Sequence, residues 1–145
     1  MNVGRNGKVR PGTRGRHYVS YVYGLMHTVA ELRSFRRAAE RAGMTDDEIA
    51  DLVSFLAENP MAGDEMTGTG GCRKLRLAGR GKGKSGGYRT ITFYSGKTMP
   101  VYLITVFSKG ERANLSKRER NALAAITKLI VEEHQTRIRD LKESR

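Results

Sequence analysis

The spacing of apolar residues predicts two helices in the first half of the chain. In each helix, four apolar residues recur at positions i, i+3, i+4 and i+7, which places them on one helical face. They are Phe35, Ala38, Ala39 and Ala42 in the first helix, and Ile49, Leu52, Val53 and Leu56 in the second. Gly43 is predicted to end the first helix. Thr45 and Glu48 have the spacing of a capping box at the start of the second, which stops before Pro60.

One short strand and three longer ones are expected from the remaining apolar runs. They are residues 27–32, 73–77, 88–94 and 101–107. In the 73–77 run, apolar residues alternate with Lys74 and Arg76, so these basic side chains are expected to face outward. The last run is almost continuously apolar and is therefore expected to be central in the sheet. A hairpin turn at residues 95–97 joins it to the run before.

A long helix is predicted towards the C-terminus. Ser116 and Glu119 have the spacing of a second capping box at its start. Its core-facing stripe is expected to consist of Leu123, Ile126, Leu129 and Ile130. From about His134 the sequence is strongly charged, and we expect this end to fray. The elements follow one another as β-α-α-β-β-β-α, which indicates an α+β fold.

The chain has 145 residues, which is enough for one domain with a single core. Its formal net charge is +12, and this charge is unevenly distributed. Residues 26–66 carry four basic and nine acidic side chains, whereas residues 67–112 carry ten basic and one acidic. Residues 1–25 carry five basic side chains and no acidic one. We expect them to be a basic flexible extension, or translated upstream sequence with Met26 as the natural start, followed by one domain at residues 26–145.

Several classes of site are disfavoured by the residue content. Cys72 is the only cysteine, so no intramolecular disulfide forms and a reducing compartment is expected. We expect Cys72 to be a small, half-buried side chain rather than a nucleophile. It has no partner at metal-ligand spacing, and His17, His27 and His134 are far apart, so we expect no metal site and no cofactor.

No apolar run approaches the roughly 20 residues that span a bilayer, and no signal-peptide core is visible. We therefore expect a cytoplasmic protein with no membrane partner.

The densest positive charge lies at residues 70–89, which hold seven Lys or Arg residues and no acid. Such a stretch favours the binding of a polyanion, above all a nucleic acid. Residues 78–85 fit a loosened phosphate-loop pattern, but a phosphate loop must open a helix, and here β-forming residues follow. The segment is therefore predicted to be a basic loop between antiparallel strands. A solvated charged face, passive nucleic-acid binding and RNA cleavage all stay open at this point.

Three segments of the sequence resemble a known family of bacterial toxins. They read FRRAAERAGMTDDEIADLVSFLAENPMAGD, GTGGCRKLRLAGRGKGKSGGYRTITFY and VYLITVFSKGERANLSKRERNAL. Together they resemble the RelE/ParE superfamily, most closely its HigB-type RelE-like branch. The resemblance covers about residues 26–132.

The resemblance implies a small twisted antiparallel sheet with two N-terminal helices packed on it and a C-terminal helix. It also implies a type II toxin, an endoribonuclease that cleaves mRNA in the A site of the 70S ribosome and so inhibits translation. A cognate antitoxin of helix-turn-helix type would neutralise the toxin, and operator DNA would be bound only through the complex of the two. The implied chemistry is a metal-free transesterification in which the RNA 2′-OH attacks the adjacent phosphate.

Catalytic roles for individual residues also follow from the resemblance. Lys74 is the candidate general base. Arg76 would bind phosphate, because a guanidinium is a poor base. Arg89, at the end of a Gly-Tyr-Arg motif, would stabilise the transition state. Lys109 or Arg112 would take the place of another basic residue of the family site.

Further residues are expected to bind RNA around that site. Leu115 stands where the type member has a tyrosine, so base stacking would fall to Tyr88 and Tyr94, unless these rings pack inside the protein instead. The expected RNA-binding residues are Arg73, Arg80, Lys82, Lys84, Tyr88 and Tyr94.

Two other functions stay open on the sequence alone. A ParE-like toxin would poison gyrase through its C-terminal region and would lack a nuclease site. A nucleic-acid-binding domain without activity would need only the positive charge. The basic strand at residues 73–77 and the Gly-Tyr-Arg motif ending at Arg89 favour the nuclease.

Overall fold

Three helices and a six-stranded sheet form the part of the chain that the computed structural model describes, namely residues 20–21, 27–79, 87–96, 98–111 and 114–144. The helices are α1 (Arg33–Ala42), α2 (Asp46–Glu58) and α3 (Lys117–Glu143). The strands are β1 (Ser20–Tyr21), β2 (Val29–Glu31), β3 (Asp64–Glu65), β4 (Cys72–Leu77), β5 (Tyr88–Phe93) and β6 (Val101–Ser108). The predicted order of elements is confirmed, with the two-residue strands β1 and β3 in addition. β1 belongs to the segment for which a flexible extension was predicted.

The strands form one sheet in the order β1-β2-β6-β5-β4-β3. Neighbouring strands are antiparallel except β2 and β6, which are parallel. This pair departs from the antiparallel sheet that the resemblance implied. Parallel neighbours need a long connection, and α1, α2 and three strands lie between β2 and β6 in the chain. β6 is paired along both of its edges, which confirms its predicted central place.

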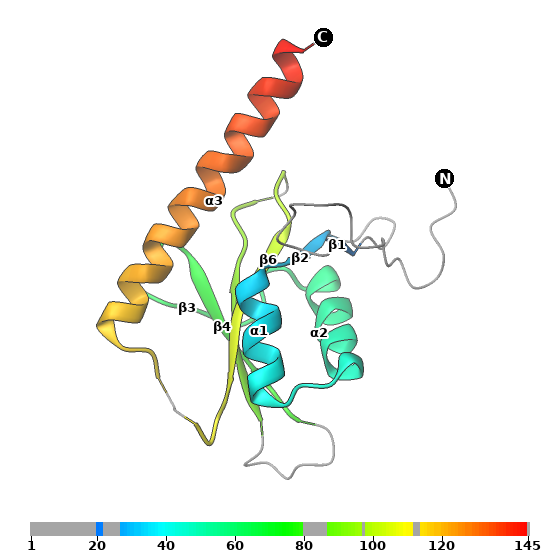
Figure 1. Cartoon of the computed structure of the whole chain (residues 1–145), viewed down its shortest axis with the longest axis vertical. Coiled ribbons are helices and arrows are strands. Elements are labelled where there is room, and N and C mark those ends of the chain that lie inside the picture. Colours follow the sequence, from blue (N-terminus) through cyan, green and yellow to red (C-terminus); the bar gives the residue numbers. More distant parts are fainter. Residues whose placement is uncertain (1–19, 22–26, 80–86, 97, 112–113, 145) are drawn as a thin grey trace.

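Helices cover both faces of the sheet (Figure 1). α1 and α2 lie on one face, and α3 lies on the other. The apolar cluster beneath α1 and α2 includes Phe35, Leu52, Val53, Leu103 and Val106. The cluster beneath α3 includes Ile91, Phe93, Ile104, Leu123 and Ile130. Burial of each side chain of this size contributes about 1.5–3 kcal/mol to the stability of the fold, so both clusters stabilise the packing of the helices on the sheet.

The predicted capping residues are confirmed. Gly43 ends α1 in the left-handed conformation, with a φ of 76° that glycine adopts without strain. At α2, the Thr45 hydroxyl accepts from the Glu48 amide at 3.1 Å, and the Glu48 carboxylate accepts from the Thr45 amide at 2.9 Å. Ser116 and Glu119 make the same reciprocal pair at the start of α3. These contacts satisfy amides that a helix start leaves without partners.

The buried side of α3 differs from the predicted stripe at one position. Leu123 and Ile130 are buried as predicted, but Leu129 is 63% exposed, so its place in the stripe was wrong. Thr127 is buried there instead, at 3% exposure. Its hydroxyl is within hydrogen-bond distance of two main-chain oxygens, that of Ala124 at 2.9 Å and that of Thr69 at 3.2 Å, so the buried hydroxyl has a partner.

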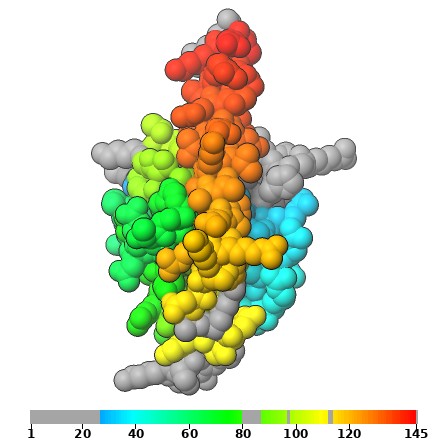
Figure 2. All heavy atoms as spheres, turned by 90° about the vertical axis from the view of Figure 1, so that its left-hand side faces the viewer, coloured from blue at the N-terminus to red at the C-terminus, as the bar shows by residue number. Residues whose placement is uncertain are grey.

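The C-terminal half of α3 does not fray at His134 but stays helical to Glu143. Figures 1 and 2 show this half projecting beyond the sheet. Arg137 pairs with Glu133 one turn earlier at 3.3 Å, and such pairs support an exposed helix. The charge of this segment therefore reflects a solvated helix rather than a frayed end.

Candidate functional site

Lys74, Arg76 and Arg89 lie on the same face of the sheet. Arg76 on β4 and Arg89 on β5 are direct partners in the antiparallel register, so their side chains leave the sheet on one side. Lys74 is two residues before Arg76 and therefore shares this side. Its register partner is Ile91, which packs in the cluster beneath α3. These three basic residues, here called the cationic cluster, thus gather on the α3 side of the sheet.

Hydrogen bonds hold two members of the cationic cluster. Arg89 is only 9% exposed, and its Nη1 donates to the main-chain oxygen of Tyr88 at 3.3 Å. Lys74 is half-buried, and its Nζ donates to Oδ1 of Asn114 at 3.3 Å. Asn114 precedes α3 and is 40 residues from Lys74 along the chain, so no local pattern pointed to it. Arg76 is exposed.

No carboxylate forms an ion pair with the cationic cluster within the described residues. The ion pairs found there join Arg36 to Glu31 and to Asp46, and Arg137 to Glu133. A nearly buried charge without a counter-ion is costly, and no described carboxylate is a counter-ion for Arg89. An oxyanion placed between Arg76 and Arg89 would offset this cost through charge-assisted hydrogen bonds.

Lys109 extends the basic region at the end of β6. Its amide donates to the main-chain oxygen of Gly87 at 2.9 Å, so it lies beside the start of β5, close to Arg89 along that strand. The Lys109 side chain is exposed. Four other predicted site residues lie outside the described residues, namely Arg80, Lys82, Lys84 and Arg112.

Three predicted RNA-binding residues are placed away from the cationic cluster. Arg73 points to the opposite face of the sheet, where its Nη1 donates to the main-chain oxygen of Gly63 at 3.1 Å. Tyr88 is 1% exposed, within the cluster beneath α1 and α2. Tyr94 packs against the same cluster, and its ring meets that of His27 edge-on at 5.3 Å. The burial of Tyr88 favours packing over base stacking for that ring, whereas Tyr94 is half-buried and base stacking by it stays a prediction.

A protein-family model matches most of the chain. The family model described as "RelE toxin of RelE / RelB toxin-antitoxin system" matches residues 27–145. The chain belongs to the RelE toxin family. It is a toxin of a toxin–antitoxin system, and an antitoxin is its partner. The resemblance to RelE-like toxins is thereby confirmed, and membership of the HigB-type branch stays a prediction.

Cys72 of this RelE-family toxin is fully buried at the start of β4. Burial raises the pKa of its thiol to about 11, and the hydrogen bond of its side chain with Thr69 offsets only part of this rise. Because the thiolate is the reactive form, Cys72 is poorly suited to be a nucleophile at neutral pH.

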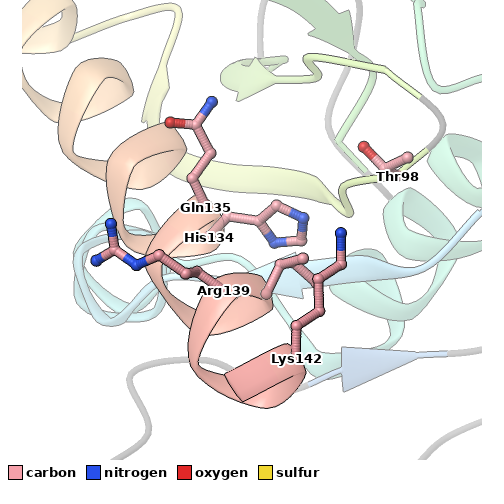
Figure 3. Close-up of a pocket in the computed structure, with 6 residues that line it drawn as sticks. Thr98, His134, Gln135, Arg139 and Lys142 are labelled. Carbon is pink, nitrogen blue, oxygen red and sulfur yellow. The ribbon is translucent and has the colours of Figure 1, made fainter.

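A separate hollow of about 500 Å³ lies towards the C-terminal half of α3 (Figure 3). His134, Arg139 and Lys142 of the RelE-family toxin line it, together with Thr98 of the β5–β6 connection. Thr98 follows the end of β5, whereas Arg89 lies at the beginning of that strand. The hollow is therefore distinct from the cationic cluster.

In the part of the toxin that the structure describes, no group of three or more His, Cys, Asp or Glu side chains is placed to hold a metal ion. None of the helices described has the length and apolar character needed to cross a membrane.

Proposed function

We propose that this toxin is a ribosome-dependent mRNA endoribonuclease that inhibits translation. The cationic cluster is the observation that supports the proposal most. Two arginines are direct partners across β4 and β5, a lysine lies two residues away, and no carboxylate of the described residues pairs with them. A phosphodiester supplies the negative charge that this cluster lacks.

Arg76 and Arg89 would bind the non-bridging oxygens of the scissile phosphate. Guanidinium groups stay charged at neutral pH, and their planar donors match a phosphate. As the 2′-oxygen approaches phosphorus, negative charge grows on these oxygens. The two arginines would therefore stabilise the transition state more than the bound substrate.

Lys74 would act as the general base. In its neutral form, Nζ takes the proton of the RNA 2′-OH, the 2′-oxygen bonds to phosphorus, and the bond from phosphorus to the 5′-oxygen breaks. The products are a 2′,3′-cyclic phosphate and a 5′-OH. Asn114 would orient the amine through its contact at 3.3 Å. Lys109 or Arg112 would protonate or stabilise the leaving 5′-oxygen.

The charge distribution supports the ribosome as the place of action. Residues 67–112 carry ten basic side chains and one acidic, and such a region is attracted to ribosomal and messenger RNA. The substrate would be mRNA in the A site of the 70S ribosome, in the cytoplasm. The antitoxin would be of helix-turn-helix type, and operator DNA would be reached only through the toxin–antitoxin complex.

Mapping mRNA 5′ ends in translating cells tests the proposal. Wild-type toxin should produce cuts in phase with codons, and Lys74→Ala and Arg89→Ala should remove them. Arg41→Ala is the matched control, because it removes an exposed positive charge from α1 on the other face of the sheet. Intact mRNA with a DNA-damage response would argue instead for gyrase poisoning. If neither mRNA cleavage nor a DNA-damage response is observed, the remaining alternative is a nucleic-acid-binding domain without activity.

A further inference from the structure

A buried polar contact lies directly behind the cationic cluster. The Tyr88 hydroxyl donates to Oε1 of Glu48 at 3.2 Å, although 40 residues separate the two in the chain. Tyr88 is the first residue of β5, and Glu48 belongs to the first turn of α2. Both are buried, and the Tyr88 ring belongs to the apolar cluster beneath α1 and α2.

Both residues of this contact also take part in a second hydrogen bond. The main-chain oxygen of Tyr88 accepts the hydrogen bond from Nη1 of Arg89. Oε1 of Glu48 also accepts from the Thr45 amide, at 2.9 Å, within the capping box of α2. A chain of hydrogen bonds therefore runs from the start of α2 through Tyr88 to the Arg89 guanidinium.

We infer that Tyr88 and Glu48 are positioning residues for Arg89. Their hydrogen bond fixes the first residue of β5, and with it the direction in which Arg89 presents its guanidinium to the phosphate. The inference rests on the proposed function, since it gives both residues a task in that site. A long connection separates β4 from β5 in the chain. The hydrogen bond from Tyr88 to Glu48 therefore attaches the first residue of β5 to α2.

The cost of the contact supports a positioning role. A buried hydroxyl and carboxylate lose hydration, and two apolar side chains of similar size would pack at these places without that loss. A hydrogen bond, unlike apolar packing, sets a direction. Burial and the neighbouring Glu48 raise the pKa of Tyr88, so its hydroxyl keeps its proton and remains the donor.

Tyr88→Phe tests the inference, because it removes the hydroxyl and keeps the ring. Single-turnover cleavage of mRNA on programmed ribosomes should slow by about tenfold at saturating toxin. The toxin concentration for half-maximal cleavage should change by less than about twofold. In an Arg89→Ala background, Tyr88→Phe should cause no further loss, because it acts through Arg89.

Thr90→Val is the matched control for the loss of a hydroxyl. Thr90 is buried on β5, two residues after Tyr88, and its hydroxyl has no hydrogen-bond partner among the described residues. Its removal should leave the cleavage rate unchanged. Glu48→Gln keeps an oxygen acceptor for the Tyr88 hydroxyl and should retain most of the rate. An unchanged rate in Tyr88→Phe, or equal losses with and without Arg89, would overturn the inference.

Amide hydrogen exchange gives a readout that does not depend on cleavage. Residues 87–90 should exchange faster in Tyr88→Phe than in the wild type, and at the wild-type rate in Thr90→Val. Unchanged exchange in Tyr88→Phe would also overturn the inference. If wild-type toxin cleaves no mRNA, the proposed function fails, and the exchange measurement still decides whether Tyr88 holds this segment.

Discussion

Arg76 and Arg89 face each other across β4 and β5 as partners in the antiparallel register. Like charges at directly opposite positions of a sheet repel and lower its stability. Neither residue forms an ion pair with a carboxylate of the described chain. The sheet therefore bears an electrostatic cost at the candidate site, as expected where charge serves a ligand rather than the fold.

Arg76→Gln should raise the free energy of unfolding by about 0.5 kcal/mol, because it removes this repulsion. It should also slow mRNA cleavage, since the proposed phosphate contact of Arg76 is lost. Urea unfolding at low ionic strength measures the first effect, which should shrink as salt is added. Lys128→Gln removes the same charge from an exposed position of α3 and should change neither quantity. Destabilisation by Arg76→Gln, or cleavage at the wild-type rate, would contradict the assignment.

Local patterns in the sequence predicted most of the fold. The capping boxes at Thr45 and Ser116 were predictable because every group in them lies within one helical turn. Apolar spacing identified the buried faces of the helices for the same reason. It did not predict that Thr127 replaces Leu129 in the core, because Thr127 is buried against residues 69 and 70, which come from a distant segment.

The candidate site was predictable only in part. Strand alternation places Lys74 and Arg76 on one face, but the register that brings Arg89 opposite Arg76 depends on long-range pairing. The same alternation places Tyr88 and Arg89 on opposite faces, which the prediction of base stacking by Tyr88 overlooked. Asn114 lies in a connection whose path depends on the packing of α3, so no local pattern indicated its contact with Lys74.

Gly70 should not accept a side chain, because it packs against α3. Its φ is 76°, and an added Cβ would lie 2.3 Å from Oγ1 of Thr127. Gly70→Ala should lower the free energy of unfolding by about 2–3 kcal/mol through backbone strain and displacement of Thr127. Gly68 has a φ of 81° with nothing within 4 Å of an added Cβ, so Gly68→Ala should cost only about 1 kcal/mol. Equal losses in chemical unfolding would show that contact with α3 does not restrict Gly70.

The stability of the toxin should fall as the pH rises from about 9 to about 11, partly because of Cys72. Its thiol pKa is about 11 in the folded protein against 9.0 for the free side chain. Between these values the unfolded chain loses the proton while the folded protein keeps it, so unfolding becomes more favourable with rising pH. The contribution reaches at most about 3 kcal/mol.

Urea unfolding across this pH range, for wild type and Cys72→Ala, isolates the contribution of the thiol. Cys72→Ala lowers stability at pH 8 because it leaves a cavity, but its decline towards pH 11 should be shallower. Tyr88, whose pKa is also raised by burial, contributes in the same direction in both proteins. Parallel pH profiles would mean that the thiol titrates equally in the folded and unfolded states.

Arg36 on α1 should stabilise the fold through Glu31 on β2. Glu31 is 2% exposed, and its Oε1 lies 2.6 Å from Nη2 of Arg36. Arg36→Ala leaves the buried carboxylate without this cation and should lower the free energy of unfolding by about 2 kcal/mol. Arg36 also approaches Asp46 at 3.5 Å, but that side chain is 99% exposed, so Asp46→Asn should change stability by less than about 0.5 kcal/mol. Arg37→Ala, an exposed neighbour on the same helix, controls for charge and helix propensity. If chemical unfolding gives equal values for Arg36→Ala and Arg37→Ala, other contacts must hold the Glu31 carboxylate.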